Sequence, residues 1–340
     1  TVQIALDAMG GDLGPQELIS GALLAVERHD LRITLVGDEQ VVQDHLQSIS
    51  ASKTLLDRMD IVHAPTVVDM DENPVDAIRR KKDSSIMVAF DLVKSGQATA
   101  AVSAGNSGAT LAAGVRKLGR LKNVARPGLA STFPTLKGPV VIMDIGANVE
   151  CRPVHLYQFG VMATAFSNLY NVDKPRVGLL TIGEESGKGN TLIKEAYSLL
   201  DRSSLNFIGN VEGRDVFQGD VDVVVCDGFV GNIVLKISEG LAEATMKMLR
   251  EEILKSTLAK VGYFLARPAF NKFKRRVDYA EYGGAPLLGI KGIGIVCHGK
   301  SSALAIKNAI IGAAEMDRLK LNDVIAGDLA KGVDAVTAGI

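Results

Sequence analysis

The sequence contains no tryptophan, only three cysteines and almost no net charge. Three cysteines cannot build a framework of disulfide pairs, which favours a reducing compartment over secretion. The 38 Lys and Arg side chains balance 39 Asp and Glu to a formal charge of −1, which argues against general affinity for nucleic acid. Residues 1–7 show no basic stretch followed by an apolar one, so we expect no signal peptide. These absences predict a cytoplasmic protein without a nucleic-acid partner.

Long apolar runs are also scarce. The clearest candidate for a membrane span is the uncharged run 95–115, which is long enough to cross a bilayer. Its centre, however, holds Gly105, Asn106 and Ser107, and these residues are too polar for a span. The pattern instead predicts a buried strand at 99–102, a glycine-rich turn and a helix that begins near Ser107.

Glycine is abundant, with 35 residues. A unit of apolar strand, glycine-rich turn and helix recurs with strands at 2–6, 99–102, 140–145, 221–226 and 293–297, and further strands are predicted at 33–36, 60–63 and 177–181. Near-continuous apolar runs are typical of strands buried on both faces. We therefore predict one α/β domain over 1–340, a mostly parallel, Rossmann-like sheet with helices on both faces.

Polar side chains accompany these glycine turns, at Asp12, Asn106, Asn148, Asn232 and His298. Glycine by itself explains only the tightness of a turn. Ligands of such sheets bind beyond the carboxyl ends of the strands, where these turns lie. We therefore predict a ligand site there.

Residues 250–277 interrupt the alternation of strands and helices. An apolar stripe at helical spacing is formed by Leu254, Leu258, Val261 and Leu265, and Pro268 is predicted to interrupt it. Eight basic and two acidic residues give the segment a formal charge of +6. We predict a projecting helical arm rather than a second domain.

Several familiar signatures are absent or misplaced. Residues 294–301 match the P-loop pattern, but 295–297 are predicted as strand and little chain follows, which argues against ATP hydrolysis. No cysteine or histidine falls in a triad or in paired metal-ligand spacing. Four aspartates, Asp7, Asp12, Asp144 and Asp227, could meet on a metal, but capping loops or orienting neighbours is favoured. We expect neither metal nor cofactor.

Two features favour an anionic ligand. Backbone N–H groups at a helix start form an anion site, so Asn106 and Ser107 would either bind phosphate or cap the helix. Lys188 follows the strand at 177–181 in a glycine-flanked loop. It is either a cation for phosphate or a developing oxyanion, or a solvated loop lysine.

Together the motifs resemble those of the bacterial phosphate acyltransferases of phospholipid synthesis, the PlsX family. The resemblance covers nearly the whole chain and rests on residues 7–12, 102–109, 144–148, 182–185 and 226–232, in the order of that family. Two departures are Ser107, where many members have threonine, and the tail after about Leu321, which matches nothing. The tail is predicted as either helix or loose chain.

The resemblance implies a reaction in which fatty acyl–acyl carrier protein and inorganic phosphate give acyl phosphate and free carrier protein. It also implies a fold similar to the isocitrate and isopropylmalate dehydrogenases and the phosphotransacetylases. It further implies a homodimer that associates peripherally with the inner face of the cell membrane. The product would pass to a membrane-bound glycerol-3-phosphate acyltransferase.

Because phosphate is the nucleophile in that reaction, no serine or cysteine triad is required. We assign Lys188 and Asn232 to phosphate and the tetrahedral oxyanion, with the Asn106 amide beside them. The turn around Asn106 is expected to contribute Ser103, Gly105, Ser107 and Gly108, and the polar wall Asp144, Asn148 and His298.

The arm has three interpretations: contact with anionic lipid, contact with the acidic carrier protein, and a dimerisation hairpin. The predicted contact residues are Leu254, Leu258, Val261, Leu265, Lys272, Arg275 and Arg276. Two rival functions remain, a decarboxylating dehydrogenase of the same fold class and a non-enzymatic membrane scaffold for lipid synthesis. The first requires an aspartate metal cluster and arginines for a dicarboxylate, neither of which is apparent.

Overall fold

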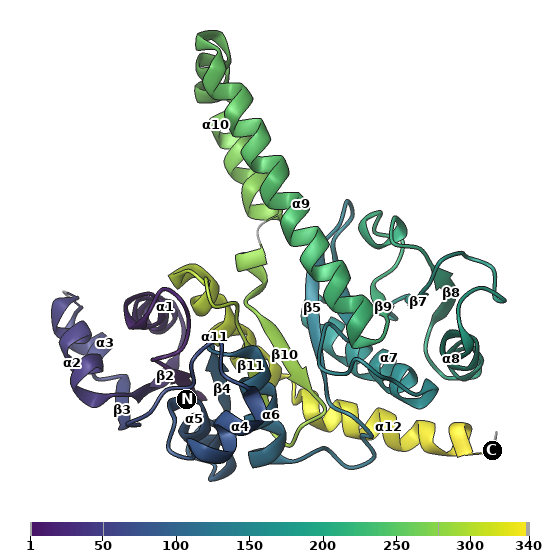
Figure 1. The fold of residues 1–340 in the computed structure, drawn as a ribbon, viewed down its shortest axis with the longest axis horizontal. Helices are drawn as coiled ribbons and strands as arrows, with labels where there is room; N and C mark the ends of the chain where they lie inside the picture. Colours follow the sequence, from purple (N-terminus) through teal and green to yellow (C-terminus); the bar gives the residue numbers. More distant parts are fainter. Residues whose placement is uncertain (1, 50, 278, 338–340) are drawn as a thin grey trace.

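The computed structural model describes residues 2–49, 51–277 and 279–337. The described strands form one eleven-stranded sheet in the order β3-β2-β1-β4-β11-β10-β5-β6-β9-β7-β8 (Figure 1). Their bounds are β1 (Val2–Asp7), β2 (Leu31–Gly37), β3 (Met59–His63), β4 (Ala100–Ser103), β5 (Gly128–Pro134), β6 (Pro139–Met143), β7 (Val177–Leu180), β8 (Phe207–Val211), β9 (Val223–Val225), β10 (Ala285–Leu288) and β11 (Ile293–Val296).

The sheet consists of two parallel halves that run in opposite directions. Strands β1 to β4 and β11 are mutually parallel, and so are β6 to β9. Between them, β10 pairs antiparallel with β11 and with β5, and β5 pairs antiparallel with β6. The prediction of a mostly parallel sheet is confirmed. The reversal places the carboxyl ends of the two halves at opposite edges, so Asp7 and Asp12 lie at a different edge from Asp144 and Asp227.

Twelve α-helices are described, and they cover both faces of the sheet, as predicted (Figure 1). They are α1 (Pro15–Arg28), α2 (Glu39–Ser48), α3 (Lys53–Leu56), α4 (Pro74–Arg80), α5 (Ser85–Lys94), α6 (Ser107–Leu118), α7 (Pro153–Ser167), α8 (Thr191–Asp201), α9 (Gly228–Lys255), α10 (Thr257–Val277), α11 (Ala303–Arg318) and α12 (Leu321–Thr337). Alternate residues of β1 separate the core into two clusters. Ile4 belongs to the cluster that includes residues of α1, α7 and α11, whereas Ala5 belongs to the cluster that includes residues of α5 and α6.

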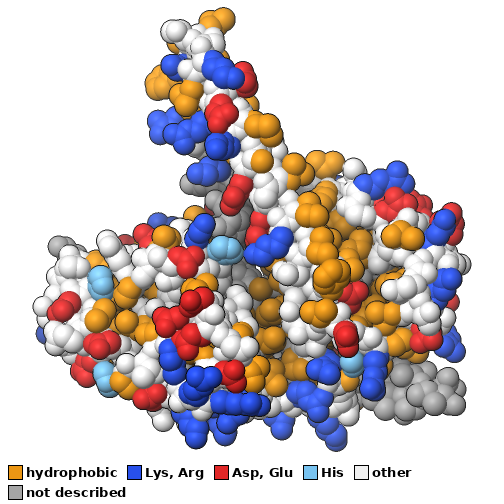
Figure 2. Space-filling view, viewed as in Figure 1, with side chains coloured by type: hydrophobic (Ala, Val, Ile, Leu, Met, Phe, Trp, Pro, Cys, Tyr) orange, Lys and Arg blue, Asp and Glu red, His pale blue; other side chains and the backbone are white. Residues whose placement is uncertain are grey.

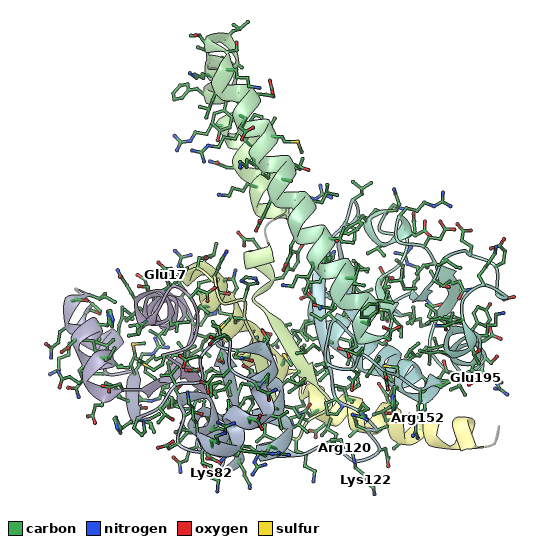
Figure 3. All side chains as sticks on the ribbon, in the orientation of Figure 1. Glu17, Lys82, Arg120, Lys122, Arg152 and Glu195 are labelled. Carbon is green, nitrogen blue, oxygen red and sulfur yellow. The ribbon has the colours of Figure 1, made fainter. Side chains whose placement is uncertain are left out.

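Side chains also tie the helices to one another. Glu17 on α1 points toward α11 (Figure 3), and its Oε2 accepts a hydrogen bond from the Ala303 backbone N–H at 2.7 Å. The Ser302 hydroxyl caps the same helix through the Ala305 N–H. A carboxylate at a helix start is favourable for the helix dipole. The α1–α11 layer is thereby fixed under the first half of the sheet.

The helical arm projects from the body, as Figure 1 shows. It is longer than the predicted 250–277 segment, because α9 runs unbroken for 28 residues before Ser256 separates it from α10. The Ser256 carbonyl accepts from the Lys260 N–H at 3.0 Å and begins α10. Pro268, at the break in the apolar stripe, does not end the helix, since α10 continues to Val277. Pro268 is exposed, so water can bond the carbonyl that proline leaves without an N–H partner.

The tail after Leu321 is helical and forms α12, which packs against α7. Gly332 lies so close to α7 that a Cβ atom there would stand 1.9 Å from the Tyr157 hydroxyl oxygen. Within the part of the chain that is described, no helix is both long and apolar enough to span a bilayer.

Candidate active site

A cleft of about 1300 Å³ lies where the two halves of the sheet meet. Ser107, Gly108 and His298 line it from the first half, and Gly146 and Asn232 line it from the second. It continues over β5 and along α9 and α10. The carboxyl ends of the strands in the two halves point in opposite directions. Residues that follow both sets of strands nevertheless line this one cleft, because it extends across the antiparallel strands β10 and β5 between the halves.

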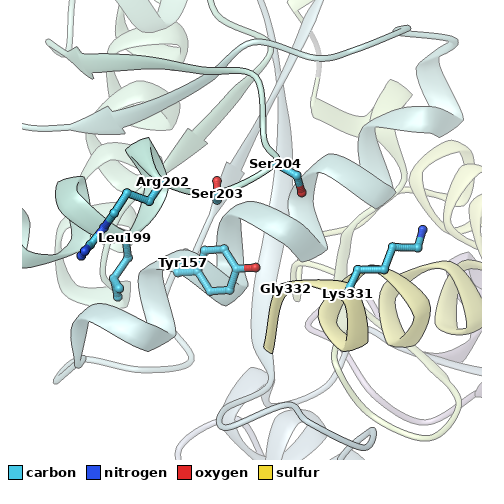
Figure 4. A pocket seen from close by; sticks show the side chains of 7 residues that line it. All are labelled: Tyr157, Leu199, Arg202, Ser203, Ser204, Lys331 and Gly332. Carbon is cyan, nitrogen blue, oxygen red and sulfur yellow. The ribbon is translucent and has the colours of Figure 1, made fainter. Parts of the chain in front are cut away.

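A second pocket is far smaller, about 60 Å³. Figure 4 shows its lining residues Tyr157, Leu199, Arg202, Ser203, Ser204, Lys331 and Gly332, which come from α7, from α8 and the turn after it, and from α12. Lys331 is already paired with Asp328 at 3.0 Å. None of the predicted site residues lines this pocket, whereas several of them line the large cleft.

In the first half, the buried side chains of Asp7 and Ser103 lie beneath two glycine-containing turns and support them. The Ser103 hydroxyl donates to Asp7 Oδ2 at 2.7 Å and accepts from the Gly105 N–H at 3.1 Å. A Cβ atom on Gly10 would lie 2.7 Å from the Gly105 nitrogen, so the turns pack with no room for a side chain. Burial raises the pKa of the Asp7 carboxyl, against the hydrogen bonds that it accepts. Ser103 and Gly105 therefore shape the turn from below.

Asn106 is buried and its amide is engaged within the protein. Its Oδ1 caps α6 by accepting from the Ala109 N–H at 3.0 Å, and its Nδ2 donates to the carbonyls of Asp69, Met70 and Glu72 at 3.3, 3.1 and 3.0 Å. The capping interpretation thus accounts for the side-chain oxygen. The cleft is reached instead by Ser107 and Gly108, in the first helical turn, where backbone N–H groups have no carbonyl partner within the helix.

In the second half, Asp144 is fully buried and gathers four N–H groups. Oδ1 accepts from the backbone of Leu129 and Ala147 at 3.0 and 3.1 Å, and Oδ2 accepts from the Asn148 backbone and amide at 2.7 and 2.9 Å. Burial raises the pKa of this carboxyl, and the four hydrogen bonds oppose that shift. Asp144 and Asn148 therefore hold the 144–148 turn in one shape.

The 144–148 turn also fixes the position of the start of α9. A Cβ atom on Gly231 would lie 1.9 Å from the Asp144 carbonyl oxygen, and the Gly228 N–H donates to the Asn148 carbonyl at 2.8 Å. Gly146 lies against Asn232, whose side-chain atoms would stand 3.6 Å from a Cβ built on that glycine. The shape of the 144–148 turn thus sets where Asn232 enters the cleft.

Lys188 and His298 complete the predicted set. Lys188 lies in the exposed loop after β7, 3.9 Å from Glu185, and it is not among the described residues that line the cleft. His298 lines the cleft, and its Nδ1 accepts from the Lys300 N–H at 3.1 Å. A neutral ring with that bond carries its hydrogen on Nε2.

The predicted arm residues divide into two groups. Leu254, Leu258, Val261 and Leu265 are 54, 81, 53 and 75 % exposed, and Lys272 is exposed as well. The Arg276 guanidinium instead donates to the carbonyls of Thr135 and Leu136, so it anchors the arm to the β5–β6 hairpin. The side chain of Arg275 lies outside the described residues.

Sequence reasoning missed the walls of the cleft. Leu129, Ser131 and Phe133 on β5 and a stripe on α9 line it, but the sequence pattern predicts neither a strand at 128–134 nor a ligand contact along 235–253. Apolar residues three and four positions apart, from Leu235 to Ile253, are the signal that could have revealed the α9 stripe.

The three cysteines remain thiols. Burial, with the nearby Asp144 charge, raises the pKa of Cys151 to about 12, and burial alone raises that of Cys297 to about 12. The pKa of Cys226 is also raised by burial. None of them is therefore a thiolate nucleophile at neutral pH. In the described ranges, no group of three His, Cys, Asp or Glu side chains is placed to hold a metal ion.

This thiol state predicts slow reaction with a thiol reagent such as Ellman's reagent at pH 8. A pKa of about 12 against an ordinary value of 9.0 leaves about a thousandfold less thiolate at Cys151 and Cys297. We expect native protein to react far more slowly than the same protein in urea, where all three thiols titrate. Rapid titration of one thiol per native chain would contradict the assignment.

Solved structures share this fold at low sequence identity. The EutD phosphotransacetylase from Staphylococcus aureus gives a TM-score of 0.60 at 18% identity and covers 92% of this chain and 93% of its own. A phosphotransacetylase from Streptococcus pyogenes gives 0.63 at 16% identity, with 94% of each chain covered. A 4-hydroxythreonine-4-phosphate dehydrogenase from Klebsiella pneumoniae gives 0.53 at 15% identity, covering 93% of this chain and 99% of its own. The fold class is therefore shared by phosphotransacetylases and dehydrogenases.

Sequence relatives are much closer and decide between these chemistries. The chain is 54% identical over 322 residues to a phosphate acyltransferase from Nitratidesulfovibrio vulgaris, covering 94% of this chain and 92% of the relative. It is 53% identical over 329 residues to one from Geotalea uraniireducens, covering 96% and 94%. The protein is thus an acyltransferase enzyme. The profile described as fatty acid synthesis protein matches residues 2–323, and the chain belongs to that family, as the PlsX resemblance predicts.

Proposed function

We propose that the cleft transfers a fatty acyl group from acyl carrier protein to inorganic phosphate. A phosphate oxygen attacks the thioester carbonyl, the C–O bond forms, and the C–S bond of the tetrahedral intermediate breaks. The leaving thiol has an ordinary pKa near 8.5, so its departure needs little acid assistance. The observation that carries the proposal is the cleft itself, which joins helix-start N–H groups and Asn232 to a long apolar wall.

The polar end of the cleft supports this division of roles. The backbone N–H groups of Ser107 and Gly108 suit phosphate, since the α6 dipole adds to them. Asn232 can donate its amide hydrogens to the oxyanion, and His298 lines the cleft from the opposite half. Lys188 is the cation that we assign to phosphate. Its ion pair with Glu185 is exposed and loose at 3.9 Å, so it costs little to exchange.

Free thiol released from palmitoyl–acyl carrier protein, with and without phosphate, tests the proposal. We expect release that requires both enzyme and phosphate. Release without phosphate would indicate a hydrolase, and binding without release would indicate a scaffold. A change in nicotinamide absorbance during turnover of a 2-hydroxy acid would instead indicate a dehydrogenase.

The exposed faces of the arm support a homodimer and a membrane contact. On the side of α9 away from the cleft, Ile237, Leu241 and Met248 are 63, 64 and 56 % exposed, a larger apolar stripe than a solitary helix usually shows to water. At the tip, Leu258 and Leu265 are more exposed still. Figure 2 shows Lys and Arg side chains gathered along the arm.

We assign the α9 stripe to a second copy of the chain and the tip to anionic lipid. Burying apolar area stabilises a dimer by about 25 cal/mol per Å². Each basic residue near an anionic surface contributes about 1 kcal/mol. Such placement would deliver acyl phosphate to a membrane-bound glycerol-3-phosphate acyltransferase and would leave the body of the protein in the cytoplasm, open to carrier protein.

Paired charge insertions separate the two assignments. We expect Leu258→Glu/Leu265→Glu to lose co-sedimentation with phosphatidylglycerol vesicles by at least tenfold while remaining dimeric. We expect Ile237→Glu/Leu241→Glu to become monomeric in size-exclusion chromatography with light scattering. Unchanged lipid binding by the tip variant would refute the membrane contact, and a dimeric stripe variant would refute the dimer face.

A further inference from the structure

We infer that the side chains of α9 that line the cleft determine which length of acyl chain the enzyme prefers. This inference rests on the proposed function, because it concerns the apolar part of the acyl donor. The cleft is lined along α9 at Asn232, Leu235, Ala242, Met246, Leu249 and Ile253. These residues recur at helical spacing and therefore form one stripe. The stripe starts at Asn232, the proposed donor to the oxyanion, and runs toward the tip of the arm.

The wall that faces this stripe carries two pairs of aromatic side chains. Phe133 on β5 and Phe217 lie edge to face with ring centroids 6.5 Å apart, and both line the cleft. Farther along, Tyr263 and Phe270 on α10 pair at 4.9 Å and line it as well. An alkyl chain is the part of the substrate that such walls desolvate favourably. The hydrogen-bond donors proposed for the thioester carbonyl stand at the Asn232 end. Charged and polar side chains of α9 also line the cleft beside the stripe, namely Lys236, Ser238, Glu239, Glu243, Lys247 and Arg250.

The rise of the helix per residue allows positions along the stripe to be compared with the length of an extended alkyl chain. At about 1.5 Å per residue, Ala242 lies about 15 Å and Met246 about 21 Å from Asn232 along α9. An extended alkyl chain with carbon–carbon bonds of about 1.52 Å and angles near 111° advances about 1.25 Å per carbon. A chain anchored at Asn232 therefore passes Ala242 near its twelfth carbon and reaches Met246 near its seventeenth.

The side chains at these two positions fit that scale. Ala242 has the smallest side chain of the apolar stripe and leaves room for the chain to continue. Met246 is half-buried and carries a long flexible side chain that fills the space beyond. We therefore assign chain-length selection to these two residues, with sixteen- to eighteen-carbon donors as the expected optimum.

The test compares phosphate-dependent thiol release from acyl carrier protein loaded with eight- to twenty-carbon chains. We expect Ala242→Phe to lower kcat/KM for the sixteen-carbon donor relative to the ten-carbon donor by at least tenfold. We expect Met246→Ala to raise kcat/KM for the twenty-carbon donor relative to the sixteen-carbon donor by at least threefold. Thr245→Phe is the matched control, since Thr245 is exposed like Ala242 but is not among the lining residues, and its profile should equal that of the unaltered enzyme.

The possible failures are distinguishable. If the unaltered enzyme releases no phosphate-dependent thiol from any donor, the proposed function is wrong. If it is active and Ala242→Phe keeps the profile of Thr245→Phe, the assignment along α9 is wrong. Should Ala242→Phe be inactive with every donor, Met246→Ala decides alone, and the absence of a relative gain with the twenty-carbon donor overturns the inference.

Discussion

Replacing Asn232 by alanine is expected to lower kcat about 10²- to 10³-fold, the usual effect of losing one oxyanion donor. The amide lies in the cleft beside Gly146, at the start of α9, where it can meet the carbonyl oxygen as negative charge develops. Because that charge exists only in the transition state, KM for the acyl donor should change little. Steady-state kinetics of thiol release measure both constants.

Two further measurements make this result specific. Asn232→Asp keeps the size of the side chain but replaces a donor by a negative charge, so it should be at least as inactive as the alanine variant. Because the Asn232 side chain is exposed, the urea midpoint of both variants should stay near that of the unaltered enzyme. Turnover within threefold of normal in Asn232→Ala would remove the residue from the proposed mechanism.

Local sequence predicts most readily the strands whose residues form near-continuous apolar runs. The runs at 2–6 and 140–145 are near-continuously apolar, and they became β1 and β6. Strand β5 contains Ser131 and Thr132 and ends in proline, and β10 has only four residues. Their pairing joins Gly128 to Leu288, a contact across much of the chain that no local pattern encodes. Without it, the opposed directions of the two halves could not be foreseen.

Local sequence likewise predicts some features of the candidate site and not others. Residues 226–232 were located from sequence because a glycine turn after a strand is a local signal, and close approach explains it, since Gly231 has no space for a Cβ atom. The engagement of Asn106 depends on three carbonyls of the loop at 69–72. That loop lies more than thirty residues away and carries no motif. That Asn106 both caps α6 and donates to this loop could therefore be seen only in the folded structure.

Replacing Asp144 by alanine is expected to lower the free energy of unfolding by at least about 4 kcal/mol. Four N–H groups, from Leu129, Ala147 and Asn148, lose their shared acceptor in a place that is 0 % exposed. Leaving a buried donor without a partner costs about 1–3 kcal/mol each, and a loss above 4 kcal/mol is exceptional for a single substitution. Asp144→Asn should be intermediate in cost, because it keeps one oxygen but turns an amide donor toward other donors.

Asp38 provides the matched control for this experiment. Its carboxylate also accepts two backbone N–H groups, from Gln40 and Val41 at 3.0 and 3.2 Å, but it does so at the partly exposed start of α2. Water can replace it there, so Asp38→Ala should cost only about 1 kcal/mol, the usual value of a helix cap. Urea unfolding of the three variants measures the order, with equal slopes indicating that stability alone has changed. An Asp144→Ala protein no less stable than Asp38→Ala would show that the 144–148 turn holds its shape without this carboxylate, and that the position of Asn232 has another cause.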